Sequence, residues 1–253
     1  MGKTGLNRIL VEAHDADIIA LEAFEAGDSA CKRRCAERAL EANALCVQAY
    51  CILGSLEEPG SDSQVDLYQR AVYAGMTLLG AKARKATVGA YPEARSLARA
   101  LFGLGQAFIA ADMMHEAIET FDSAIHIDKE DGFHARYQLA RCLLQTGQTA
   151  HLTRLLKAYG DDKSSVWLWT LALTSFKLDA DVALRDGALE DALDANPYLA
   201  GYLIGKRRWD GATPLTYRPG DEAEAAWYAA QFQRFWTARP AALQWLAARS
   251  GIH

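Results

Sequence analysis

Small and large residues alternate along residues 103–125, GLGQAFIAADMMHEAIETFDSAI, at the spacing of helix faces. Gly105 and Phe108 share one face of a first helix, while Ala117, Phe121 and Ala124 share one face of a second. A small residue on one helix lets the next helix approach closely. The stretch therefore predicts a tightly packed helical hairpin.

The same pattern returns along the chain at a period of about 35 residues, which lies within the range of helical repeat arrays. The corresponding positions are Tyr50, Leu53 and Gly54 upstream, then Arg136, Leu139, Ala140, Leu143, Leu152, Leu156 and Tyr159, and then Trp169, Ala172, Leu173, Phe176, Leu189, Ala192 and Pro197. Such hairpins cannot bury their apolar faces alone, so stacked neighbours supply the core and form a superhelix with a concave side.

Nearly every segment is typical of an amphipathic helix, because alanine is frequent and apolar residues recur every three or four positions. We find no convincing strand. Turn residues cluster at 25–29, 41–45, 57–63, 126–132, 145–149, 159–165 and 194–198. They divide the chain into helices of about a dozen residues, which is an ordinary globular length.

These markers resemble the tetratricopeptide repeat, in which the first helix carries an aromatic, Leu-Gly and an aromatic, and the second carries Ala, an aromatic, Ala and Pro. The unit from Ala98 to Asp131 matches at almost every marker, with Lys129 in place of the closing proline. The resemblance implies an all-α, right-handed helical-hairpin solenoid, a tetratricopeptide-like superhelix.

We expect a single domain over residues 1–253, with repeats at 1–80 and 97–197 and a cap at 198–253. Residues 81–96 form an irregular connection, with a bend near 85–92. Pro92 is well placed in the first turn of the following helix, because a helix does not use that donor.

The tail resembles the suppressor of tumorigenicity-like family and its bacterial relatives. That family follows its repeats with Asn-Pro, Tyr-Leu-x-Gly, Gly-Asp-x-x-Glu-Ala and a terminal Trp-Leu, which occur here within 194–209 and 217–247. Physically the tail is interpreted as an aromatic cap on the last repeat, made by Trp209, Tyr217, Trp227, Tyr228, Phe232, Phe235, Trp236 and Trp245. Asp221 is expected to cap a helix, and Glu222 and Glu224 suit its positive end.

Composition limits the possible partners. No apolar run reaches the length of a spanning helix and no leader precedes the repeats, so we expect a cytoplasmic protein that does not enter a membrane. The net charge of -5 argues against nucleic acid. The basic runs at 82–85 and 205–208 are interpreted as solvated charges rather than a binding patch.

No sequence motif points to catalysis or to a cofactor. GKT at residues 2–4 lacks the glycines and strand of a nucleotide site, and 128–134 lacks the alternating ligands of a calcium loop. Five cysteines suit a reducing compartment. Cys31, Cys35, Cys46 and Cys51 lack the usual zinc spacing, so core packing is favoured over metal binding. We expect no enzyme, no cofactor and no metal.

Binding of another molecule is the class of function that these observations leave. In such arrays the first helix of each hairpin lines the concave face. Ten residues are predicted to lie there: Arg99, Phe102, Gln106, His134, Tyr137, Gln138, Arg141, Trp167, Thr174 and Lys177. The mix is mildly cationic, aromatic and rich in amides, which suits an extended peptide or protein segment carrying carboxylates. Ordinary solvated helix faces also carry Arg and Gln, so that interpretation stays open.

The sequence therefore predicts an adaptor that binds a protein segment on its concave face. A second hypothesis is a subunit that docks through its ends, in a complex or a homodimer, because 7–27 would leave an apolar side uncovered. The third hypothesis is an enzyme whose active site lies in the concave groove.

Overall fold

The computed structural model describes residues 16, 18–20, 22, 27–85, 87, 89, 91–214 and 216–251 of the 253. Within these residues every regular element is a helix, and no strand occurs. Most of the N-terminal stretch 7–27 and part of the expected bend at 85–92 lie outside the described residues.

The chain divides into two compact units, residues 1–142 and 143–253, and the boundary falls within α7. The first unit contains α2 (Ser29–Ala42), α3 (Val47–Ser55), α4 (Asp62–Leu79), the 3-10 helix η1 (Gly80–Lys85), α5 (Pro92–Ala110), α6 (Met114–Ile127) and most of α7 (Ala135–Thr146). The second contains α8 (Thr149–Ala158), α9 (Ser165–Lys177), α10 (Val182–Ala195), α11 (Leu199–Leu203), α12 (Glu222–Thr237) and α13 (Pro240–Ser250). The prediction of one continuous domain stays a prediction.

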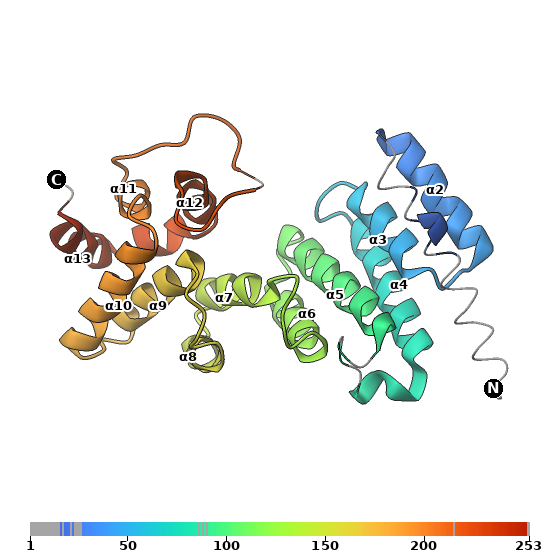
Figure 1. Ribbon diagram of the computed structural model, residues 1–253, viewed down its shortest axis with the longest axis horizontal. Helices are drawn as coiled ribbons and strands as arrows, with labels where there is room; N and C mark the ends of the chain where they lie inside the picture. The colour runs from blue at the N-terminus through green and yellow to red at the C-terminus, as the bar shows by residue number, and fades with distance from the viewer. Residues whose placement is uncertain are drawn as a thin grey trace. The chain divides into compact units, whose positions relative to one another are not determined.

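Helix ends follow the turn signals of the sequence. The side chains of Asp28, Ser61 and Ser164 accept hydrogen bonds at the starts of α2, α4 and α9, as N-caps do. A proline occupies the first turn of α5, as expected. Consecutive helices α2 to α6 pack on one another, and α3 also contacts α5, so the first unit is a stack of hairpins (Figure 1).

Glycines decide how closely these helices approach. A Cβ built on Gly105 of α5 would lie 2.6 Å from the ring of Phe121 in α6, which is fully buried. The ring of Tyr68 in α4 occupies a similar position between Gly54 of α3 and Gly103 of α5, where added Cβ atoms would lie 2.9 and 2.2 Å from it. The large residues therefore fit against backbone that glycine leaves bare.

Aromatic side chains form much of the core of the second unit. The rings of Trp169 and Trp236 meet edge to face at 5.8 Å, and those of Tyr228 and Phe232 stack at 4.6 Å. The expected aromatic packing of the tail thus holds for Tyr228, Phe232, Phe235, Trp236 and Trp245, which are buried. Trp209 and Tyr217 differ, being 40% and 37% exposed.

A buried carboxylate joins the two tail motifs. Glu224 Oε2 accepts hydrogen bonds from Ser165 Oγ at 2.7 Å, Asn196 Nδ2 at 3.1 Å and the Gly220 backbone N–H at 2.7 Å. Asp221 caps α12 by accepting from the Glu224 backbone N–H at 2.7 Å. The Asn-Pro and Gly-Asp-x-x-Glu segments therefore meet at one group that fixes α12 against α9 and the end of α10.

We predict that Gly105→Ala lowers the free energy of unfolding by about 1 to 3 kcal/mol, because the new methyl group would overlap the buried Phe121 ring. Gly187→Ala in α10 is the matched control. Nothing lies within 4 Å of its added Cβ, so it should stabilise by about 0.5 to 1 kcal/mol. Urea unfolding of both variants measures the difference, and equal effects would contradict close packing at Gly105.

We predict that Glu224→Ala destabilises the second unit by about 1 to 3 kcal/mol for each buried donor left without an acceptor. Glu224→Gln retains an acceptor oxygen and should cost less. Glu190→Ala, at an exposed position of α10, should change stability by at most about 0.5 kcal/mol. Thermal unfolding of the three variants tests this order, and a Glu224→Ala protein as stable as Glu190→Ala would refute it.

Candidate functional site

A pocket of about 340 Å³ opens between the first helices of two successive hairpins in the N-terminal unit. We call it the α3–α5 pocket. It is lined by Gln48, Cys51, Ile52, Ser55, Tyr68, Arg99, Phe102, Gly103 and Gln106. Three of the ten predicted groove residues, Arg99, Phe102 and Gln106, therefore lie together in one cavity.

Tyr68 reaches the pocket from the second helix of its hairpin. The aromatic ring passes between Gly54 and Gly103, and Tyr68 is among the residues that line the cavity. Burial, with a smaller effect of Cys51, raises the pKa of Tyr68 from its ordinary value to about 12. The hydroxyl group is therefore neutral at physiological pH and can both donate and accept a hydrogen bond.

Arg99 is held at the rim by neighbours from other elements. Its guanidinium donates to Gln48 Oε1 at 3.2 Å and lies 5.8 Å from the centre of the Phe133 ring. Gln48 in turn donates to Ser96 Oγ at 3.3 Å. These contacts orient the positive charge before any ligand arrives, which reduces the entropy lost on binding.

Two residues that line the pocket carry polar groups with no hydrogen-bond partner among the described residues. Within the part of the chain that the structure describes, neither the Tyr68 hydroxyl nor the Gln106 carboxamide makes a hydrogen bond. Ser55 differs, because its hydroxyl donates to the carbonyl of Ile52 at 2.7 Å. The pocket thus offers unused donors and acceptors beside the apolar side chains of Ile52 and Phe102.

The other predicted groove residues fall in both units and differ in access. His134 is exposed and stacks on Tyr137 at 5.4 Å, and the Arg141 guanidinium donates to Gln138 Oε1 at 3.3 Å. Tyr137, Gln138, Trp167 and Thr174 are buried.

In the second unit, the Thr174 hydroxyl donates to the Thr170 carbonyl at 2.7 Å, and Trp167 meets Tyr159 edge to face. Burial, together with the charge of Arg239, lowers the pKa of Lys177. Trp167 and Thr174 therefore pack in the core around α9, whereas Lys177 is only half-buried.

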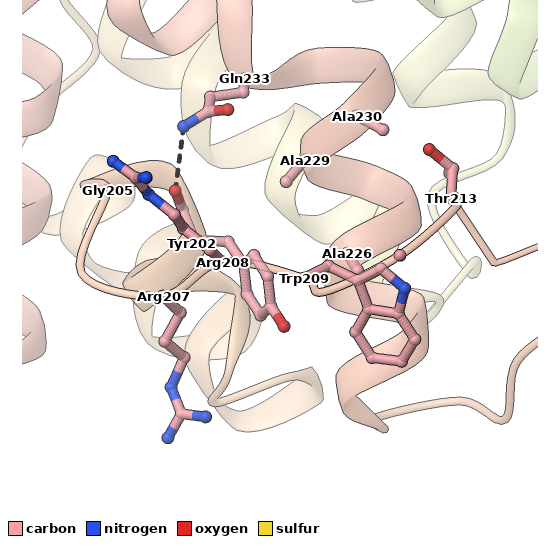
Figure 2. A pocket seen from close by; sticks show the side chains of 11 residues that line it. Tyr202, Gly205, Arg207, Arg208, Trp209, Thr213, Ala226, Ala229, Ala230 and Gln233 are labelled. Atoms are coloured by element: carbon pink, nitrogen blue, oxygen red, sulfur yellow. Dashed lines mark hydrogen bonds between the residues drawn. The ribbon is translucent and has the colours of Figure 1, made fainter.

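A second pocket, of about 450 Å³, lies in the C-terminal unit (Figure 2). We call it the α11–α12 pocket. Its lining comes from α11, from the segment that follows it and from one face of α12, and comprises Tyr202, Gly205, Arg207, Arg208, Trp209, Gly211, Thr213, Ala226, Ala229, Ala230 and Gln233. The basic run at 205–208, which the sequence suggests is solvated charge, contributes Gly205, Arg207 and Arg208 to this cavity, and no sequence pattern predicted the cavity.

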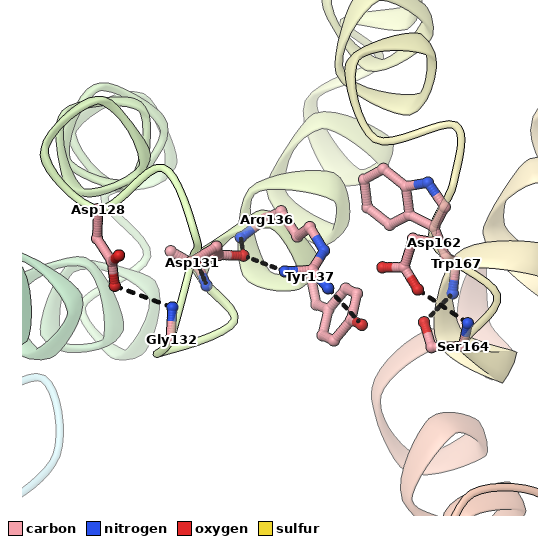
Figure 3. A network of polar contacts seen from close by, with 9 residues as sticks. Asp128, Asp131, Gly132, Arg136, Tyr137, Asp162, Ser164 and Trp167 are labelled. Atoms are coloured by element: carbon pink, nitrogen blue, oxygen red, sulfur yellow. Dashed lines mark hydrogen bonds and ion pairs between the residues drawn. The ribbon is translucent and has the colours of Figure 1, made fainter. Parts of the chain in front are cut away.

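The acidic run at 128–134 forms a turn, as expected (Figure 3). Asp131 is buried and accepts from the backbone N–H of Ala135 at 2.6 Å and from the Arg136 guanidinium at 2.8 Å. Burial raises the pKa of Asp131, against the opposing effect of Arg136. In the other unit, Asp162 accepts from the Ser164 N–H at 2.8 Å before α9 (Figure 3). Asp131 thus satisfies backbone N–H groups in the first turn of α7, and Asp162 orders the turn that leads into α9.

The five cysteines are free thiols, and all but Cys31 are buried. Burial and the neighbouring Cys31 raise the pKa of the Cys35 thiol. Among the described residues no cluster of three or more His, Cys, Asp or Glu could hold a metal ion. No helix in the described part of the chain is long and apolar enough to span a membrane.

Sequence reasoning missed Gln48, Ser55 and Tyr68 as pocket residues. The residues predicted to contact a ligand all come from the first helices of the central repeats, whereas Tyr68 belongs to a second helix. The signal that could have found it is the pair Gly54 and Gly103, one on each flanking first helix, because two bare positions leave room for a ring between them.

The raised pKa of Tyr68 predicts an alkaline titration. Because the folded value exceeds the ordinary value of about 10, its contribution to stability is complete below pH 10 and is lost as the pH rises through about 12. Tyrosinate absorbance should show one group titrating near 12 that Tyr68→Phe removes. Tyr73→Phe, on the exposed side of α4, should leave it in place. An unchanged curve for Tyr68→Phe would contradict the buried setting.

No protein-family model matches the chain, and no curated protein matches its sequence. Among solved structures the chain is similar to YrrB, described as a TPR protein with an unusual peptide-binding site, with a TM-score of 0.51 and 16% identity. The match covers 69% of this chain and 81% of that one. At this identity the likeness establishes the fold alone: the chain is an all-α, TPR-like helical solenoid.

Proposed function

We propose that the chain is a non-catalytic interaction module whose α3–α5 pocket binds an extended segment of another protein. The observation that carries this proposal is that Tyr68 and Gln106, which line one cavity on the first-helix side, carry polar side-chain groups that make no hydrogen bond within the described part of the chain. The TPR-like fold supports it, as does the peptide-binding site described for YrrB.

The polar groups suit a peptide backbone. A glutamine side chain presents one acceptor oxygen and two donor hydrogens, so Gln106 can pair with both the C=O and the N–H of an extended chain. The neutral Tyr68 hydroxyl can satisfy a further backbone group. An extended segment leaves these backbone groups free, whereas a helical ligand has already paired them internally.

The remaining lining residues suggest which side chains the segment carries. Arg99 places an oriented positive charge at the rim, which favours an aspartate or glutamate. Phe102, between the rings of Phe121 and Phe133, and Ile52 offer apolar contact. The segment therefore combines an acidic residue with an adjacent apolar one.

We also propose the finer features that the sequence predicted: further groove contacts, the cellular location, the family and the mode of assembly. His134, Arg141 and Lys177 remain candidate contacts for a longer ligand, and the cytoplasm remains the expected location. Membership of the suppressor of tumorigenicity-like family is also a proposal, supported by the contact between its two tail motifs at Asn196 and Glu224. Assembly through the chain ends, including a homodimer, is the alternative function.

We would test the pocket by selecting binders from a displayed random peptide library with the full chain, and by measuring the selected peptide with each variant. We expect enrichment of acidic and apolar residues. Tyr68→Phe and Gln106→Leu should each weaken binding by about three- to tenfold, because each removes a hydrogen bond of about 0.5 to 1.5 kcal/mol.

Tyr73→Phe and Gln69→Leu are the matched controls, since both residues lie exposed on α4 and outside the pocket. Melting temperatures confirm that all four variants fold. Equal affinity across the pocket and control variants, or no enriched peptide at all, would refute the pocket as the binding site and favour assembly through the ends.

A further inference from the structure

We propose that the α11–α12 pocket is a second binding site, and that it takes a planar aromatic anion such as an aryl carboxylate. Its volume of about 450 Å³ lies in the range of about 300 to 1,000 Å³ typical of small-molecule sites. All of its lining residues lie within 202–233 of the C-terminal unit. The site is therefore separate from the α3–α5 pocket.

The basic segment is fixed in place by α11. The backbone N–H groups of Lys206 and Arg207 both donate to the Gly201 carbonyl at 2.9 Å, which turns the chain back toward α12. A Cβ on Gly201 would lie 2.9 Å from the Arg207 side chain, so glycine allows that side chain to lie against the helix. The Arg207 guanidinium lies 5.2 Å from the centre of the Tyr198 ring and pairs with Glu222 at 2.8 Å.

Arg208 then supplies the charge that a ligand can use. Within the described residues its guanidinium makes no hydrogen bond and no ion pair. Arg207 and Glu222 neutralise one another, while Lys206 and Arg208 outnumber the remaining acid of this segment, Asp210. A guanidinium binds a carboxylate through two parallel hydrogen bonds, so an anion gains both charge and geometry here.

Trp209 presents an oriented aromatic surface. Its Nε1 donates to the Ala212 carbonyl at 3.0 Å, which fixes the indole, yet the residue remains 40% exposed. Figure 2 shows the ring beside Ala226 of α12. An exposed, fixed indole favours stacking with a flat ring, which adds to the gain from buried area alone.

The opposite wall is small enough to leave room for that ring. Ala226, Ala229 and Ala230 occupy one face of α12, and the next turn carries Gln233, whose amide donates to the Tyr202 carbonyl at 3.0 Å (Figure 2). Thr213 adds a hydroxyl that makes no hydrogen bond within the described chain. A ligand with a flat ring beside Trp209 and its anionic group at the far end, past Tyr202 where the Arg208 guanidinium lies, matches this lining (Figure 2).

The test is isothermal titration calorimetry of the full chain with naphthoate. Naphthylmethanol keeps the ring without the charge, and cyclohexanecarboxylate keeps the charge without the planar ring. We expect saturable binding of naphthoate. Naphthylmethanol should bind at least about tenfold more weakly because a charge-assisted hydrogen bond is lost, and cyclohexanecarboxylate about two- to tenfold more weakly because the stacked ring is lost.

Variants assign the binding to the pocket. Arg208→Gln removes the guanidinium, and Ala230→Leu fills the cavity from an exposed position, so each should weaken naphthoate binding about tenfold or more. Arg218→Gln, in the same connecting segment but outside the lining, is the matched control and should bind as wild type does.

Two results would overturn the proposal. The first is no saturable heat with wild type at millimolar naphthoate. The second is equal affinity in Arg208→Gln and Arg218→Gln proteins that melt at the wild-type temperature. Neither result bears on the α3–α5 pocket, because the peptide and naphthoate experiments use different residues and ligands.

Discussion

The structure depends on large aromatic side chains packed against glycine on a neighbouring helix. Phe121 lies against Gly105 within one hairpin, and Tyr68 lies between Gly54 and Gly103 of two successive first helices. Interiors this dense tolerate neither an added methyl group nor a lost ring without cost. Tyr68 also lines the cavity between α3 and α5. The same residue therefore packs the helices together and contributes to the candidate binding pocket.

In the C-terminal unit, a buried polar network rather than ring-against-glycine packing holds the last helices in place. Its last helices are joined to α9 by a buried carboxylate, Glu224, which Ser165, Asn196 and the Gly220 backbone satisfy together. Because a buried polar group that lacks a hydrogen bond lowers the stability of the fold, this network favours the one arrangement of the tail in which all three bonds form. That arrangement places the small face of α12 beside Arg208 and Trp209. The two units thus carry separate pockets with different chemistry.

Local sequence signals predicted the helices well. Turn residues mark the starts of α4 and α9 and the end of α6, and small-large alternation identified the Gly105–Phe121 contact. The candidate sites were harder to predict, because a pocket depends on which side chains remain unpaired after packing. Arg99, Phe102 and Gln106 were found from helix periodicity, whereas Tyr68 enters from a helix that the projection ignored. Periodicity could not distinguish the buried Thr174 from an accessible residue either, since its hydroxyl bonds to its own helix.

The most direct test of peptide binding in the α3–α5 pocket is a nuclear magnetic resonance titration of nitrogen-15-labelled protein with the selected peptide. We predict that the side-chain amide signals of Gln48 and Gln106 shift, together with backbone signals of α3 and α5 around Gly54 and Gly103. Signals of residues 205–213 should stay unchanged. Shifts confined to the C-terminal unit, with Gln48 and Gln106 unperturbed, would contradict peptide binding in the α3–α5 pocket.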